Sequence, residues 1–102
     1  MSSTPHRSID IDANRLWDSL MQMAEVGPSP NGGSRRLAMT PEDADGRRLL
    51  LDWVEALGCT WQRDKAGNLF IRRAGREDHL PPVSMGSHLD TQPLGGRFDG
   101  VL

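Results

Sequence analysis

The hydrophobic pattern of the chain changes its period at Gly58, and this change constrains the fold more than any other feature. Before Gly58, apolar residues recur at helical spacing in two segments, from Asp12 to Gly27 and from Thr40 onward. After Gly58, short runs rich in Trp, Thr, Phe and Ile follow the period of two that is typical of strands. The order helix, helix, strand, strand, strand predicts an α/β or α+β fold.

Both predicted helices have recognisable N-termini, because Asp12 and Thr40 are residue types that cap the free amides of a first turn. The first helix is expected to bury an apolar stripe made of Leu16, Leu20 and Met23, widened by Trp17, Met21 and Ala24. The second is expected to bury Leu50, Trp53, Val54 and Leu57. Gly46 weakens the second helix by up to about 1 kcal/mol relative to alanine, and nothing in the sequence compensates for it.

Three strands are expected after the helices. Residues 59–64 and 68–72 predict a hairpin, and the run Val-Ser-Met-Gly-Ser at 83–87 predicts a short buried strand of a sheet that is incomplete in this chain. Residues 1–9 are polar and aperiodic, so we expect a disordered lead-in. The sequence stops at Leu102 within an apolar pattern, from which we infer a fragment.

Charge and cysteine content argue against several classes of protein. Twelve basic and fourteen acidic residues give a net charge of -2 without a basic stripe, so nucleic acid is not an expected partner. Cys59 has no second thiol with which to form a disulfide, and this favours the reducing cytoplasm. Its side chain is expected to be a small buried hydrophobe. No apolar run approaches the roughly 18 residues of a membrane span, so no membrane association is expected. His6 and His79 lie in polar stretches and are expected to be solvated.

The residues that could carry chemistry follow the third predicted strand. His88 and Asp90 are two positions apart, so both side chains can lie on the same side of an extended chain. A metal-bound imidazole usually donates its other ring N–H to a carboxylate, a role that Asp90 could fill for His88. Asp99 follows in a glycine-rich stretch that permits close backbone approach, and its carboxylate could bridge two cations. A lone His-x-Asp is a common pattern and Gly-x-x-Asp-Gly alone is usually a turn, whereas the two together favour a metal site.

These residues belong to a longer resemblance. Residues 86–93 (Gly-Ser-His-Leu-Asp-Thr-Gln-Pro) and 95–102 (Gly-Gly-Arg-Phe-Asp-Gly-Val-Leu) together resemble the first metal-binding signature of the hydantoinase/carbamoylase amidase family. Upstream, Gly32-Gly33 with residues 36–40 and Asp64 with residues 67–70 are also similar to the family pattern, so the likeness covers most of residues 10–102. The family includes N-carbamoyl-L-amino-acid hydrolases, β-ureidopropionases and allantoate amidohydrolases, within the aminoacylase and carboxypeptidase-like dinuclear metallohydrolases.

The resemblance implies a role for each candidate residue. His88 would bind one metal ion, Asp99 would bridge two ions, and Asp90 would orient His88. The ions would be zinc, with manganese, cobalt or nickel as alternatives. Residues 10–102 would form the N-terminal part of a zinc-peptidase-like catalytic domain. The remaining ligands, an adjacent pair of glutamates and a dimerisation domain that makes the full-length protein a homodimer would lie beyond Leu102.

The resemblance also implies the substrate class, which is a small molecule with a ureido or amide bond. Thr91-Gln92-Pro93 is more similar to carbamoylases and β-ureidopropionases than to allantoate amidohydrolases, which favours an N-carbamoyl-L-amino acid. An allantoate amidohydrolase and an aminopeptidase or dipeptidase of the same clan are the alternatives. A different class of hypothesis is that these residues form only a non-catalytic folding unit or partner-binding module.

Overall fold

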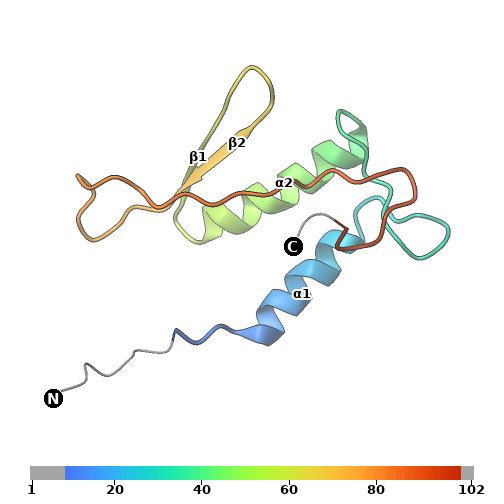
Figure 1. The fold of residues 1–102 in the computed structure, drawn as a ribbon, viewed down its shortest axis with the longest axis horizontal. Coiled ribbons are helices and arrows are strands. Elements are labelled where there is room, and N and C mark those ends of the chain that lie inside the picture. Colours follow the sequence, from blue (N-terminus) through green and yellow to red (C-terminus); the bar gives the residue numbers. More distant parts are fainter. Residues whose placement is uncertain (1–8, 100–102) are drawn as a thin grey trace, which may run out of the picture.

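A computed structural model describes residues 9–99. These residues form helices α1 (Ala13–Ala24) and α2 (Pro41–Ala56) and strands β1 (Thr60–Arg63) and β2 (Leu69–Arg72), as Figure 1 shows. The strands make an antiparallel hairpin in which Thr60 lies opposite Arg72. The predicted partial α/β fold, with two helices and a hairpin, is confirmed. The expected lead-in lies outside the described residues except for Ile9, as do Gly100, Val101 and Leu102 of the family signature.

Helix α1 begins where the sequence predicts and buries less than expected. The Asp12 carboxylate accepts a hydrogen bond from the Arg15 amide at 3.0 Å, which caps the first turn. Met23 is buried at the C-terminal end, but Leu16 and Trp17 remain 48% and 54% exposed. The predicted buried stripe is therefore wrong over its first half, because among residues 9–99 the neighbours of Leu16 and Trp17 cover these side chains only in part.

Helix α2 begins at the expected cap residue, Thr40. The Thr40 hydroxyl accepts a hydrogen bond from the Asp43 amide at 3.3 Å, and the Asp43 carboxylate accepts one from the Met39 amide at 3.0 Å. This reciprocal arrangement satisfies donors that a helix N-terminus leaves free. Gly58 follows the helix with φ of 78°, a conformation that suits a residue without a side chain. Of the predicted apolar face, Leu50, Trp53 and Val54 are partly buried, whereas Leu57 is exposed.

The hairpin turn is organised by Asp64. Its Oδ1 atom accepts hydrogen bonds from the amides of Ala66 at 3.0 Å and Asn68 at 2.8 Å, and its Oδ2 accepts one from the Asn68 side chain at 2.9 Å. Gly67 has φ of 90°, which a turn of this shape requires. Arg47 of α2 donates a hydrogen bond to the Gly67 carbonyl, so the turn is tied back to the helix.

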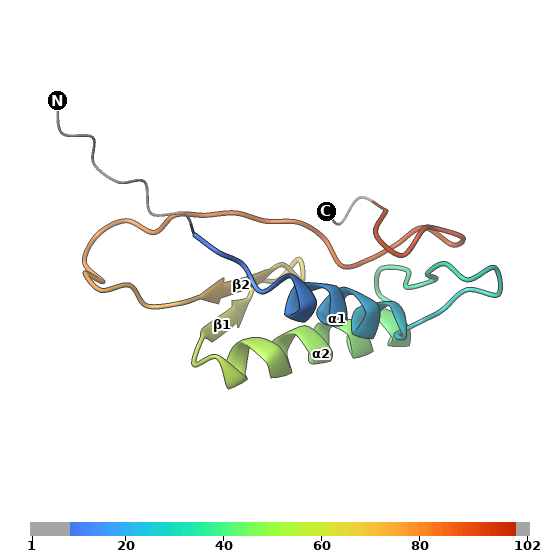
Figure 2. The ribbon, with the colours of Figure 1, turned by 90° about the horizontal axis from the view of Figure 1, so that it is seen from below.

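The third predicted strand does not form within the described chain. Residues 83–87 are not part of a strand in the described chain, and Val83 and Met85 are 91% and 92% exposed. In both ribbon views this stretch runs along the length of α2 (Figures 1 and 2). The prediction of a buried strand is wrong for residues 9–99, because the faces of a buried strand need cover and the side chains of Val83 and Met85 have almost none there.

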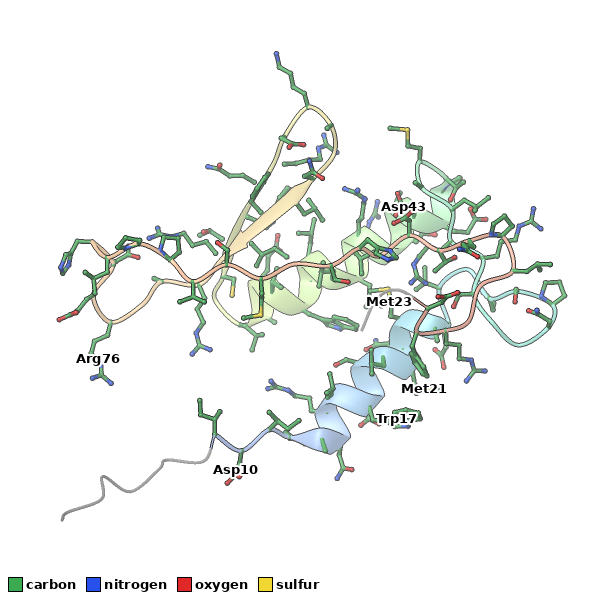
Figure 3. The ribbon with its side chains drawn as sticks, viewed as in Figure 1. Asp10, Trp17, Met21, Met23, Asp43 and Arg76 are labelled. Carbon is green, nitrogen blue, oxygen red and sulfur yellow. The ribbon has the colours of Figure 1, made fainter. Side chains whose placement is uncertain are left out.

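The interior of the described chain is small and mostly polar. Two apolar residues, Met23 and Ala24, are buried. The buried polar residues are Ser29, Ser34, Arg36, Asp43 and Thr91. Figure 3 shows Met23 where α1 approaches α2, and a Cβ atom built on Gly46 of α2 would lie 3.5 Å from the Met23 sulfur. The two helices therefore meet at this point.

The remaining expectations concern single residues and the membrane. His79 is exposed, as predicted, and His6 lies outside the described residues. Cys59 is half-buried rather than fully buried. Neither helix within residues 9–99 has the length and apolar character that a membrane crossing requires.

Candidate metal-binding site

His88 and Asp90 lie against each other, as their spacing predicts. The Nδ1 atom of His88 is 3.2 Å from the Asp90 carboxylate and 2.9 Å from the Asp90 carbonyl oxygen, and both side chains are partly exposed. Because both contacts use Nδ1, the ring proton is favoured on that atom and the lone pair on Nε2. This is the tautomer in which an imidazole can bind a metal ion through Nε2 while a carboxylate holds its other side.

The pair borders an open hollow. Residues 85–90 form one wall, and α2 and the hairpin form the others, around a cavity of about 520 Å³. Asp43, which Figure 3 shows near the N-terminal end of α2, also lines it. The Asp43 carboxylate already accepts the Met39 amide and lies 3.5 Å from the Arg47 guanidinium, so it is engaged in local structure.

Asp99 lies in a separate turn. Its amide donates to the Gly96 carbonyl at 3.3 Å, and its side chain is exposed. Within residues 9–99, no three His, Cys, Asp or Glu side chains gather closely enough to hold a metal ion. The structure thus brings His88 and Asp90 together but does not bring Asp99 to them. An imidazole supported by a carboxylate, with a further aspartate nearby in sequence, suits a divalent ion that accepts mixed nitrogen and oxygen ligands. The metal-binding roles of these three residues stay predictions.

The residue that sequence reasoning missed is Arg36, which is only 1% exposed. Its Nε donates to the Leu89 carbonyl at 2.9 Å, and one terminal nitrogen donates to the carbonyls of Met23 at 3.1 Å and Val26 at 2.8 Å. Burial lowers the pKa of the Arg36 guanidinium, and the negative charges of Asp43 and Asp90 oppose that shift. An arginine remains charged under any such shift, so this is a buried cation held by main-chain oxygens.

The main chain of Arg36 also makes two hydrogen bonds with Thr91, one to its hydroxyl and one to its amide. The Arg36 amide donates to the Thr91 hydroxyl at 2.7 Å, and the Thr91 amide donates to the Arg36 carbonyl at 2.8 Å. Two residues earlier, the Ser34 amide donates to the Gly95 carbonyl at 2.9 Å. Residues 34–36 therefore lie beside both stretches that carry the candidate ligands.

The turn that carries Asp99 is fixed by further contacts. Arg97 donates to the Gly32 carbonyl at 2.9 Å, and the rings of Phe98 and Trp17 lie 5.8 Å apart, centre to centre. Figure 3 shows Trp17 and Met21 on the side of α1 that faces this turn, and the Met21 sulfur is 3.9 Å from the Arg97 guanidinium. One face of α1 thus holds the second ligand-bearing stretch.

The position of Gly46 in the middle of α2 is explained by its neighbour Arg36. A Cβ atom at Gly46 would lie 2.8 Å from Cδ of Arg36, a distance that real Cβ atoms essentially never show. Gly46 therefore makes room for the buried guanidinium. A glycine inside a helical pattern is a known sign of close approach, and here it could have pointed to a bulky neighbour.

Comparison with known proteins agrees with these observations. No protein-family model matches the chain. It is 48% identical over 100 residues to the N-carbamoyl-L-amino-acid amidohydrolase of Rhizobium meliloti, an alignment that covers 98% of this chain and 24% of that protein. The crystal structure of an amidase of the hydantoinase/carbamoylase family from Burkholderia multivorans superposes with a TM-score of 0.88 at 53% identity, over 93% of this chain and 23% of that one. The chain is homologous to the hydantoinase/carbamoylase amidases.

The chain is also similar to a protein with a different name. The chain is 32% identical over 95 residues to the ureidoglycolate hydrolase of Arabidopsis thaliana, covering 93% of this chain and 20% of that protein. The chain thus spans a quarter or less of the length of these relatives. The resemblance seen in residues 86–102 and upstream is confirmed.

Proposed function

We propose that this chain supplies the first part of the metal site of an amidohydrolase that cleaves a linear ureido C–N bond. The proposed substrate is an N-carbamoyl-L-amino acid, which would yield the amino acid, ammonia and carbon dioxide. The observation that carries the proposal is the contact of His88 Nδ1 with the Asp90 carboxylate, 3.2 Å away, in a chain 48% identical to part of an N-carbamoyl-L-amino-acid amidohydrolase.

Each residue has a proposed task in that reaction. His88 would hold one divalent ion through Nε2, Asp90 would keep the imidazole in the correct tautomer, and Asp99 would offer a bridging carboxylate. Two bound ions, zinc or alternatively manganese, cobalt or nickel, would supply an acidified water and polarise the substrate carbonyl. The remaining ligands and the general base would come from a longer chain.

The isolated residues 1–102 are expected to be inactive and to bind metal weakly. A catalytic zinc normally needs three protein ligands with one position left open, and His88 and Asp99 provide two. Calorimetric titration of the 102-residue chain with Zn²⁺ tests this expectation. Tight binding, or turnover of a substrate by the isolated chain, would contradict it.

Activity is tested on the longest open reading frame that contains this chain. We expect the purified, metal-loaded protein to release ammonia from N-carbamoyl-L-amino acids, and His88→Ala to abolish that release. His79→Ala is the matched control, because His79 is exposed and lies away from the candidate residues in the sequence. Cleavage of dipeptides without cleavage of any ureido compound would refute the proposed substrate class.

A second candidate substrate is favoured by the likeness to a ureidoglycolate hydrolase at 32% identity. Allantoate and ureidoglycolate therefore belong in the same assay, and a preference for either would move the assignment within the family. The non-catalytic hypothesis is tested at the level of the gene. An adjacent pair of glutamates encoded a few tens of residues after Leu102 supports the enzyme, and an in-frame stop codon supports a folding unit or binding module.

A further inference from the structure

We propose that Arg36 is a positioning residue of the candidate metal site, which acts by holding the main chain between His88 and Thr91. The metal ion in this inference rests on the proposed function. The positioning role itself rests on the contacts of Arg36. No described hydrogen bond of Arg36 reaches a proposed metal-ligand atom. Its amide and guanidinium donate to main-chain oxygens and one hydroxyl, and its carbonyl accepts from the Thr91 amide.

The first step of the argument is the place at which the guanidinium acts. Leu89 is the residue between His88 and Asp90, and its carbonyl accepts from Arg36 Nε at 2.9 Å. Fixing this peptide group fixes the direction in which the flanking side chains leave the main chain. The close approach of His88 Nδ1 to the Asp90 carboxylate therefore depends on an atom that Arg36 holds.

The second step is that residue 36 holds the chain on both sides of Asp90. Besides the contact to Leu89, the amide and the carbonyl of Arg36 bond to the hydroxyl and the amide of Thr91, at 2.7 and 2.8 Å. One residue thus makes three hydrogen bonds to the three-residue stretch that contains the proposed tautomer-setting carboxylate. These bonds are buried or partly buried, where an unmade bond costs more than at the surface.

The third step is that the guanidinium ties this stretch to a fixed element. The same group donates to the carbonyls of Met23 and Val26, at the C-terminal end of α1. A helix C-terminus leaves its last carbonyls unpaired and carries a partial negative charge, so it attracts a cation. The acceptors are neutral oxygens, which leaves the Asp90 carboxylate available to His88.

The chemistry of the site requires arginine at this position. Its planar guanidinium presents separate N–H groups in fixed directions, and these reach Leu89 on one side and the end of α1 on the other. A lysine has one ammonium group and cannot hold both sets of acceptors in the same way. Because Gly46 has no side chain, α2 leaves space there for the Arg36 side chain.

The test uses the 102-residue chain and the side-chain nitrogen NMR signals of His88, at about pH 8, where an unperturbed imidazole is neutral. In the unmodified chain we expect the ring proton on Nδ1. In Arg36→Lys we expect a mixture of tautomers and about tenfold weaker Zn²⁺ binding in a shift titration, the low end of the loss seen for outer-shell partners of ligands. Arg35→Lys is the matched control, because Arg35 is adjacent and exposed, and it should behave as the unmodified chain.

A second pair of variants decides the matter if Arg36→Lys unfolds. Thr91→Val removes the hydroxyl that accepts from the Arg36 amide, and Thr91→Ser keeps it. We expect the tautomer mixture in the valine variant and its rescue in the serine variant. Unchanged His88 signals and Zn²⁺ affinity in Thr91→Val, or in a folded Arg36→Lys, would overturn the inference. If tautomer control by Arg36 is observed but Zn²⁺ does not perturb His88, the positioning role is supported and the proposed metal role of His88 fails.

Discussion

Residues 9–72 and residues 73–99 obtain their shapes in different ways. The first region makes its backbone hydrogen bonds between near neighbours, in α1, α2 and the hairpin. The second has short turns of its own, such as the bond from the Gly95 amide to the Gln92 carbonyl. Its part from Leu89 to Arg97 is also held by residues far away in sequence. Hydrogen bonds join Ser34 to Gly95 and Arg36 to Thr91, and these bonds connect the two regions.

This difference bears on function because the candidate ligands all lie in the second region. A ligand must be held in place by groups that are themselves fixed. Here the fixed groups are the end of α1 and the stretch 34–36, and the linking side chain is Arg36. The first region is therefore best regarded as the support that sets the geometry of the second.

The strongest test of this comparison is removal of the link. Arg36→Met should lower the free energy of unfolding by about 3 kcal/mol, because buried carbonyl oxygens lose their donors. Urea denaturation followed by circular dichroism measures the loss. Arg35→Met replaces an exposed neighbour and should change stability by no more than about 0.5 kcal/mol. Equal losses in the two variants would show that Arg36 is not a special link.

A second test reverses the usual effect of a helix substitution. Replacing glycine by alanine inside a helix normally adds about 1 kcal/mol of stability. Gly46→Ala should instead remove about 1–2 kcal/mol, because the new methyl group would lie 2.8 Å from Cδ of a side chain fixed by buried hydrogen bonds. Asp45→Ala, at the exposed neighbouring position, is the control and should be neutral or slightly stabilising. A stabilised Gly46→Ala variant would contradict the packing described for Arg36.

The sequence predicted those parts of the fold that depend on local chemistry. Asp12 and Thr40 cap the helices because a side-chain oxygen near a free amide needs no distant partner. The hairpin follows from its turn residues in the same way. Burial was predicted less well, since Leu16 and Val83 are exposed where the pattern indicated a core. Periodicity shows which face is apolar but not which element covers it.

The candidate site also has one feature that local sequence predicts and one that depends on distant residues. The contact between His88 and Asp90 follows from a spacing of two in an extended chain, and the sequence was sufficient to predict it. The role of Arg36 was not predictable from spacing, because its partners at 23, 26, 89 and 91 are distant in the chain. A charged residue is usually exposed, so a buried arginine contradicts the usual expectation.

A third test weakens the first region alone. Thr40→Ala removes the hydroxyl that caps α2 and should lower the unfolding free energy by about 1 kcal/mol, whereas Thr40→Ser should retain most of it. The NMR signals of His88 should not change in either variant. A changed His88 tautomer in Thr40→Ala would show that helix capping, rather than Arg36, controls the site.

The smallest expected effect concerns pH and the hairpin. Hydrogen bonds from Asn68, and from the amides of Ala66 and Gly67, lower the pKa of the exposed Asp64 carboxyl. A group with a lowered pKa stabilises the folded form above its unfolded value of about 4, and this contribution is lost as pH falls through the folded value. Amide chemical shifts of residues 64–68 should report a looser turn in acid. In Asp64→Asn that titration should vanish, and an unaltered titration would assign it to another group.

Native-state hydrogen exchange tests the link between the two regions most directly, because it reads individual amides. The amides of Ser34 and Thr91 donate to Gly95 and Arg36 and connect the two regions, whereas those of 83–86 make no backbone hydrogen bond within residues 9–99. We predict slow exchange at Ser34 and Thr91 in the unmodified chain, and exchange at Thr91 as fast as at 83–86 in Arg36→Lys, with α2 still protected. Equally fast exchange at Ser34, Thr91 and 83–86 in the unmodified chain would contradict the proposal that residues 34–36 hold the ligand-bearing stretches.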